Sequence, residues 1–133
     1  MKQEIVHPEN AGKGFSTGAY SAAVEIDGWV YVSGQGPIDF TTSEFKLGSI
    51  EEETRLTMHN IESILRAAGC TMDDIVKCNV HLSNIDHFPG FNTEYANWFT
   101  GVKPARTTVQ SGLGHDIKVE IDAIARKPKQ LEQ

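Results

Sequence analysis

Apolar residues recur along this chain at two spacings, which predict strands in some segments and helices in others. In "SAAVEIDGWVYVSGQGP" (21–37), two apolar runs flank Asp27-Gly28. Both turn residues tolerate positive φ, so this pattern predicts a hairpin with one strand ending at Ile26 and the next beginning at Trp29. In residues 73–83, strict alternation places Val76, Cys78, Val80 and Leu82 on one face of a strand and Lys77, Asn79 and His81 on the other.

Two helices are predicted from three- and four-residue spacing. The first begins near Ser49, which forms a capping box with Glu52, and ends at Gly69. Its apolar face comprises Thr54, Met58, Ile61, Leu65 and Ala68. The second follows Pro89, a residue suited to a first helical turn. Its aromatic stripe, which we expect to be core, comprises Phe88, Phe91, Tyr95, Trp98 and Phe99.

The last two predicted strands span 105–111 and 117–126. The first, within "KPARTTVQS", carries Arg106 on the face it shares with Thr108 and Gln110. In the second, Val119, Ile121, Ala123 and Ala125 share one face, and Lys118, Glu120, Asp122 and Ile124 share the other. The order strand, strand, helix, strand, helix, strand, strand predicts an α+β fold with both helices on one sheet face.

That architecture leaves the second sheet face without a cover. Trp29, Tyr31, Val119 and Ile121 are too apolar for a fully wet surface. Symmetric self-association would cover the face and create pockets between subunits.

Composition narrows the function. The 133 residues fit a single domain, 1–133, and the formal net charge of −6 argues against nucleic acid or an anionic membrane as a partner. Cys70 and Cys78 have neither disulfide nor metal-site spacing, so we expect buried free thiols. The N-terminus lacks a signal-like apolar run, and we expect a cytoplasmic protein.

Common catalytic motifs do not fit the chain. The five histidines lack metal-site spacing, and the glycines of "SGQGP" (33–37) do not form a nucleotide-binding motif, so we expect neither a metal nor a cofactor. No nucleophile elbow is visible. Arg106 and Glu120 remain as charged strand residues that could bind a substrate or transfer a proton. Periodicity alone favours a structural role, either an ion pair between them across the sheet or an arginine that reaches solvent along its aliphatic stem. The alternative is an arginine that binds a substrate carboxylate beside a glutamate that deprotonates water.

Five segments together resemble the RidA/YjgF family of enamine/imine deaminases. "PART" and "KVEIDAIA" are similar to the family's P-A-R-S-C-V and K-I-E-I-E-A-I-A runs, and "TGAY" (17–20), "VYVSGQGP" (30–37) and "FNTEYANWF" (91–99) agree in order. The resemblance implies a chorismate-mutase-like α+β subunit, a homotrimer with intersubunit clefts, and cofactor-free hydrolysis of 2-enamino and 2-imino acids, such as 2-aminoacrylate, to 2-keto acids and ammonia.

The resemblance also assigns residue roles. It implies that Arg106 pairs with the substrate carboxylate and that Glu120 orients the hydrolytic water. It implies a cleft lined by Tyr20, Ser33, Gly34, Asn92 and the residue at 108. Thr108 stands where the family commonly has cysteine, so a backbone role would survive and a thiol role would not. The connection 111–116 is one residue shorter than usual, which leaves the substrate range open.

Three alternatives to a small-imine deaminase remain. One is a 2-aminomuconate-type deaminase, in which Lys13 or His115 would supply a second anchor for a dicarboxylate. Another is a non-catalytic sensor of small carboxylates, against which the presence of Glu120 argues. The third, an RNA-binding nuclease, conflicts with the net charge of −6.

Overall fold

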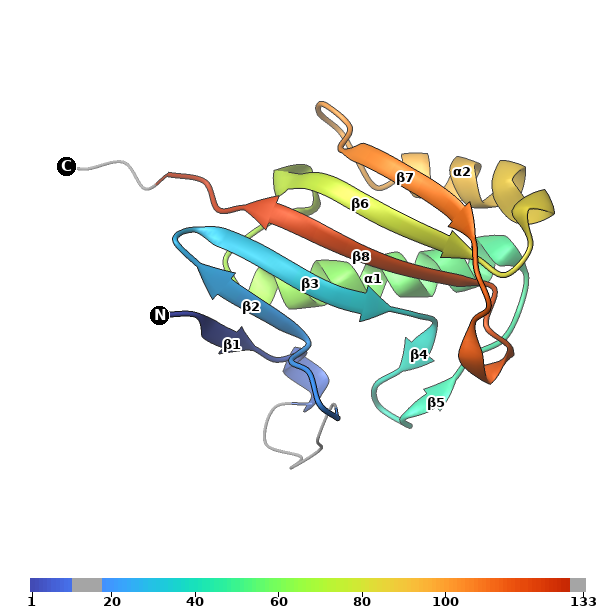
Figure 1. The fold of residues 1–133 in the computed structure, drawn as a ribbon, viewed down its shortest axis with the longest axis horizontal. Helices are drawn as coiled ribbons and strands as arrows, with labels where there is room; N and C mark the ends of the chain where they lie inside the picture. Colours follow the sequence, from blue (N-terminus) through green and yellow to red (C-terminus); the bar gives the residue numbers. More distant parts are fainter. Residues whose placement is uncertain (11–17, 130–133) are drawn as a thin grey trace.

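A six-stranded mixed sheet carries two helices on one of its faces (Figure 1). The computed structural model describes residues 1–10 and 18–129. The strand order is β1-β2-β3-β8-β6-β7, in which β7 lies parallel to β6 and the other pairs are antiparallel. The strands are β1 Gln3–Ile5, β2 Ala23–Ile26, β3 Trp29–Gln35, β6 Ile75–Leu82, β7 Ala105–Gln110 and β8 Val119–Arg126.

The predicted hairpin and first helix are confirmed in detail. Asp27 and Gly28 adopt φ values of 52° and 83° at the β2–β3 turn, the left-handed conformation that this turn requires. Helix α1 (Ile50–Ala67) begins with the Ser49–Glu52 capping box, and Gly69 follows it with φ 84°. Both ends of α1 are therefore set by local residues.

The core lies between the sheet and the two helices. Helix α2 (Phe88–Ala96) begins with Pro89 in its first turn and buries Phe91 and Tyr95. Its aromatic stripe is core as predicted, with Phe88 and Trp98 at the margin. From β8, the buried side chains are Val119, Ile121, Ala123 and Ala125.

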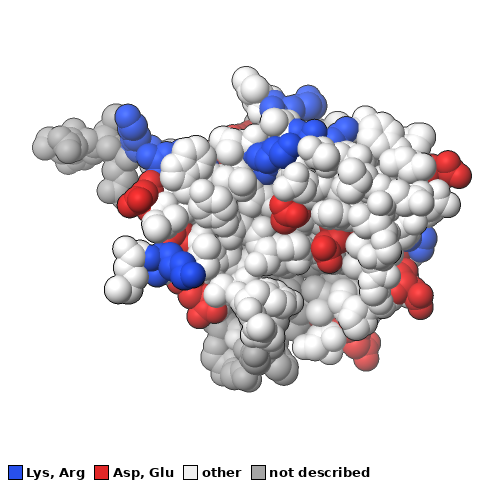
Figure 2. Space-filling model, in the orientation of Figure 1, with Lys and Arg blue, Asp and Glu red and all other residues white. Residues whose placement is uncertain are grey.

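Two predictions about the faces are wrong. Val119 and Ile121 belong to the helix-covered core; of the four residues assigned to the bare face, only Trp29 and Tyr31 are exposed there, at 38% and 43%. Val76 is exposed because the β6–β8 register shifts between Ile75 and Lys77, which turns it away from the core. The bare face itself is confirmed: no helix lies over it in Figure 1, and Figure 2 shows a mostly uncharged surface with acidic side chains near its middle.

Short elements complete the described chain. Between β3 and α1, the chain forms a small hairpin, β4 (Ile38–Asp39) and β5 (Glu44–Phe45). Four 3-10 turns are η1 Pro8–Asn10, η2 Met72–Asp74, η3 Ile85–His87 and η4 Gly114–Asp116. None of the helices in the described ranges is both long and apolar enough to cross a membrane.

Candidate functional site

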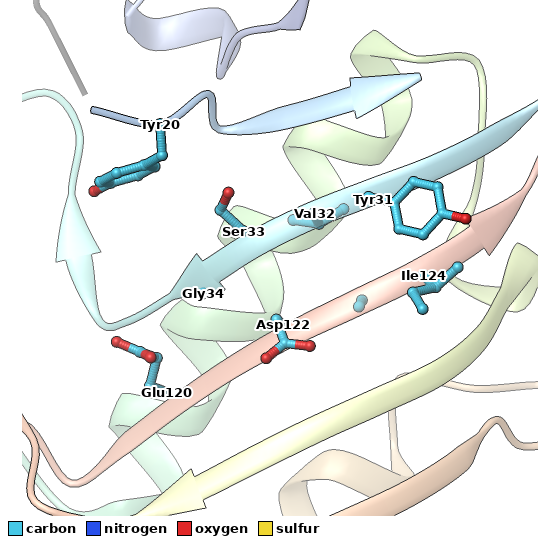
Figure 3. A pocket seen from close by; sticks show the side chains of 9 residues that line it. Tyr20, Tyr31, Val32, Ser33, Gly34, Glu120, Asp122 and Ile124 are labelled. Atoms are coloured by element: carbon cyan, nitrogen blue, oxygen red, sulfur yellow. The ribbon is translucent and has the colours of Figure 1, made fainter. Parts of the chain in front are cut away.

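A hollow of about 560 Å³ opens on the bare sheet face where β3 lies beside β8. We call it the open-face hollow; the polar residues that line it are Tyr20, Tyr31, Ser33, Glu120 and Asp122, together with Gly34. Figure 3 shows the Glu120 and Asp122 carboxylates projecting from β8 and the Ser33 hydroxyl from β3. Four of the residues that the resemblance assigns to the site, Tyr20, Ser33, Gly34 and Glu120, therefore lie together.

The absence of a side chain at Gly34 makes room for Glu120. A Cβ atom at Gly34 would lie 2.8 Å from Glu120 Oε2 and 3.0 Å from its Cδ, closer than Cβ atoms approach such groups. The register between β3 and β8 shifts between Val32 and Gln35, so the strand bends beside this contact. Glu120 thus lies directly against the β3 backbone.

Buried hydrogen bonds fix the strand on which Glu120 sits. Glu53, fully buried in the first turn of α1, accepts from Lys118 N at 2.7 Å, Lys118 Nζ at 3.0 Å and Gly48 N at 3.1 Å. Asn60, also on α1, donates to Gly36 O at 3.2 Å and Ile38 O at 2.8 Å. Helix α1 therefore sets both the start of β8 and the exit of β3.

The open-face hollow carries negative charge and no positive charge. Glu120 and Asp122 are its two acids, and its lining contains no Lys, Arg or His among the described residues. Asp122 accepts a hydrogen bond from Asn79 at 2.9 Å, whereas no described residue hydrogen-bonds to the Glu120 carboxylate. An anionic ligand would need a cation from elsewhere to bind here.

A second hollow, of about 460 Å³, shares Tyr20, Gly34 and Glu120 with the first. We call it the hairpin hollow because it lies between the β4–β5 hairpin and η4. Its wall includes His115, which adopts φ 59° and stacks on Phe45 with ring centroids 4.4 Å apart. His115 therefore lies in the wall of the hairpin hollow, whereas Lys13 is outside the described residues.

Arg106 lies on the opposite, helix-covered face. It pairs with Cys78 of β6, which is fully buried under the helices, so both side chains point the same way. Its Nη1 donates to Asn92 Oδ1 of α2 at 2.8 Å. Its guanidinium carbon lies 5.4, 5.5 and 4.9 Å from the ring centres of Phe88, Phe91 and Tyr95.

The ion pair between Arg106 and Glu120 that periodicity favoured is wrong. Strand β6 lies between β7 and β8, and Glu120 pairs with His81, three residues beyond Cys78 and therefore on the other face. From ordinary strand spacings, the two Cα atoms are about 14 Å apart. No described acidic side chain forms an ion pair with Arg106.

The side chain of Thr108 points toward the helix-covered core, and its backbone N–H and C=O point toward the free edge of β7. Its Oγ1 is buried without a hydrogen-bond partner among the described residues. Ser111 N donates to Leu82 O, and backbone direction alternates along a strand, so the N–H and C=O of Thr108 face the free edge of β7. Only the backbone of Thr108 is available to a ligand.

The two cysteines are buried free thiols, as predicted. Burial raises the pKa of the Cys70 thiol to about 11 and also raises the pKa of Cys78. Burial likewise raises the pKa of Tyr95, so its ring is neutral beneath Arg106. Within residues 1–10 and 18–129, no three His, Cys, Asp or Glu side chains are close enough together to hold a metal ion.

Sequence reasoning missed Asp122 in the open-face hollow, Glu53 behind it, and the three rings around Arg106. The alternation of β8 places Asp122 on the same face as Glu120, so that signal was present. The aromatic stripe was visible as a core pattern, but nothing in its spacing indicated that β7 would place an arginine against it.

Comparisons with known proteins find relatives over most of the chain. The family model described as endoribonuclease L-PSP matches residues 13–127. A RutC family protein of Pyrococcus horikoshii is 40% identical over 126 residues, 94% of this chain and 98% of that one. A mouse (Mus musculus) protein named 2-iminobutanoate/2-iminopropanoate deaminase is 38% identical over 109 residues, 81% of each chain. A crystal structure of a Rid family protein from Yersinia pestis has a TM-score of 0.87 at 38% identity and covers 95% of this chain and 99% of that one.

Proposed function

Because this chain belongs to the RidA/YjgF family, we propose that it hydrolyses small 2-imino and 2-enamino acids to 2-keto acids and ammonia, without a cofactor. We further propose that it does so as a homotrimer, at clefts formed where the free edge of β7 in one subunit meets the open-face hollow of the next. The mouse and rat relatives named as imine deaminases support the reaction class.

The observation that carries the proposal is the separation of Arg106 and Glu120. Among the described residues of one subunit, the guanidinium has no acidic partner, and the acids on the opposite face have no cation beside them in the open-face hollow. A three-carbon imino acid is too short to span the distance of about 14 Å between the two Cα atoms and to reach both faces of the sheet. Two copies would bring a complete site together, and the same contact would cover Trp29 and Tyr31.

In the proposed cleft, Arg106 holds the substrate carboxylate through two parallel hydrogen bonds, which fix its plane. Asn92 holds the guanidinium in place, and the backbone N–H of Thr108 lies at the same edge to donate to the carboxylate. The carboxylate is bonded directly to the imine carbon, so anchoring it also fixes the reacting atom.

Glu120 would act as the acid–base group. With the imine nitrogen protonated, it removes a proton from water as the water oxygen bonds to the imine carbon, which gives a neutral carbinolamine. It then returns that proton to the amine nitrogen and takes the hydroxyl proton as the carbon–nitrogen bond breaks, so that the carbonyl forms and ammonia leaves. The proton left on Glu120 passes to the ammonia. Tyr20 and Ser33 border this position; the Ser33 hydroxyl donates to Ser21 O at 2.6 Å, so its oxygen can accept from the water.

A larger substrate of the 2-aminomuconate type is a second candidate, favoured by the hairpin hollow. That hollow continues from Glu120 toward His115, which could contact a distal carboxylate. Comparing imines derived from alanine and glutamate would separate the two: a kcat/KM preference for the glutamate imine that His115→Ala abolishes would favour the larger class.

The test of the proposed reaction is to generate 2-aminoacrylate in situ and follow the loss of its imine tautomer against buffer. We expect acceleration that collapses in Arg106→Ala and falls substantially in Glu120→Ala. If wild type and Arg106→Ala behave alike with several imino acids, the proposed function is wrong.

A further inference from the structure

The aromatic stripe of α2 has a second surface that faces Arg106. The rings of Phe88, Phe91 and Tyr95 follow one another with centroids 6.3 and 5.3 Å apart, and the guanidinium carbon lies within 5.5 Å of all three. This is within the range at which a cation is attracted to a ring face. We call these three rings the arginine cage.

The cage replaces the acid that usually partners a half-buried arginine. No acidic side chain among those described pairs with Arg106, and its one protein acceptor is the neutral Asn92 amide. A carboxylate in that place would compete with an incoming anion. Neutral rings stabilise the charge and leave the remaining N–H donors available.

The cage also limits the freedom of a flexible side chain. An arginine that must order itself on binding loses affinity, whereas one already held in place does not. The rings restrict the position of the guanidinium, and the hydrogen bond from Nη1 to Asn92 Oδ1 restricts its rotation. Position and plane are the two quantities that a bidentate carboxylate contact requires.

We propose that Phe88, Phe91 and Tyr95 are positioning residues, which hold the Arg106 guanidinium by cation–π contact in the orientation that receives the substrate carboxylate. This inference rests on the proposed function and adds the groups that make Arg106 competent. Phe91 and Tyr95 also fill the core, but Phe88 lies at its margin. Phe88 is therefore the ring whose removal separates positioning from folding.

Phe99 provides a matched control. It contacts the Tyr95 ring at 5.0 Å and is buried in the same core, but it is not one of the rings within cation–π distance of Arg106. Phe88→Leu and Phe99→Leu therefore each remove one phenyl ring, and the two rings lie at opposite ends of the aromatic stripe. Phe88→Tyr keeps a ring face at the cage and serves as the conservative rescue.

The experiment measures the dissociation constant of pyruvate by calorimetry, together with KM and kcat for the imine and the melting temperature of each variant. We expect Phe88→Leu to raise the pyruvate dissociation constant and KM roughly three- to tenfold, with kcat within about twofold of wild type. Phe88→Tyr should have the pyruvate dissociation constant and KM of wild type. Phe99→Leu should lower the melting temperature and leave the dissociation constant and KM unchanged.

Two results would overturn the inference and leave the proposed function intact. One is unchanged pyruvate binding in Phe88→Leu while Arg106→Ala loses it. The other is an equal rise in Phe88→Leu and Phe99→Leu, which would indicate general loosening of α2. Unaltered imine hydrolysis in Arg106→Ala would instead refute the proposed function, and the cage inference with it.

Discussion

Arg106 and Glu120 lie on opposite faces of one sheet, with the whole of β6 between their strands. Within the part of the chain that the structure describes, Arg106 has no acidic partner and the open-face hollow has no cation. The proposed intersubunit site follows from this separation: in it, a second copy of the chain supplies the group that each subunit lacks at its own face.

Gly34→Ala should reduce turnover by displacing Glu120. The new Cβ would approach Glu120 Oε2 to 2.8 Å, and the flexible carboxylate would yield before the backbone does. We expect kcat to fall roughly a hundredfold, since displacing a catalytic group by about 1 Å costs that much, while stability changes little. Steady-state kinetics with an imine generated in situ measures this.

Gly112→Ala is the matched control for that substitution. A Cβ at Gly112 meets nothing within 4 Å, so kinetics and melting temperature should both match wild type. Equal kcat in Gly34→Ala and wild type would show that the position of Glu120 does not limit the reaction.

Thr108→Val should stabilise the fold and preserve activity. The buried Oγ1 has no described hydrogen-bond partner, and valine has nearly the same shape without the polar atom. We expect a gain of about 1 kcal/mol in the free energy of unfolding in urea, measured at fixed protein concentration, with kcat/KM unchanged. A loss of activity would mean that the hydroxyl, rather than the backbone, contacts substrate.

Asp73 should make stability depend on pH in the acid range. Hydrogen bonds from the Thr100 hydroxyl, Thr100 N and Gly101 N hold the pKa of its carboxyl below the usual value. A pKa lower in the folded state stabilises the protein above the unfolded pKa of about 3.9, and that contribution is lost as pH falls through the folded pKa. Asp73→Asn should therefore be less stable than wild type at neutral pH, with the difference shrinking below about pH 4.

The control for Asp73 is Asp86→Asn, which removes an acid whose carboxylate makes no hydrogen bond among the described residues. Its stability difference from wild type should stay small and nearly constant across the same pH series. If the difference in stability between wild type and Asp73→Asn is equally independent of pH, the proposed contribution of the Asp73 carboxylate to stability is wrong.

Tyr31→Glu should dissociate the oligomer. Tyr31 is 43% exposed in the middle of the bare face, and a buried, unpaired carboxylate at a subunit contact is costly. Sedimentation velocity should show monomers and the imine assay should show loss of activity, although Arg106 and Glu120 are both present. Val102→Glu, at a residue 92% exposed outside the sheet, should leave both measurements unchanged; a wild-type monomer would contradict the trimer directly.

Local signals predicted the elements well, because each depends on neighbouring residues. Asp27-Gly28 can form the β2–β3 turn by itself, and Ser49 with Glu52 closes the N-terminus of α1 without help from the rest of the chain. The alternation of β8 likewise predicted that Glu120 lies away from the core.

Strand order could not be predicted from the same signals. The sequence places β7 directly before β8, but the structure inserts β6 between them, since pairing between distant segments depends on packing of the whole core. That one insertion removes the expected ion pair and brings Arg106 against α2. The residues of the candidate site were assigned by family resemblance, and their roles remain predictions that substitution and kinetics can test.

The most direct test of the central claim mixes two variants, one inactive and one with little activity. Arg106→Ala keeps Glu120, and Glu120→Ala keeps Arg106, so sites shared between subunits become complete again wherever the two kinds of chain meet. After unfolding and refolding at equal amounts, we expect about one quarter of wild-type activity from random trimers. The two variants refolded separately and then combined without exchange should show only the residual activity of Glu120→Ala. If co-refolded mixed trimers form and are no more active than this control, Arg106 and Glu120 of different subunits do not share a site, and the proposed intersubunit cleft is wrong.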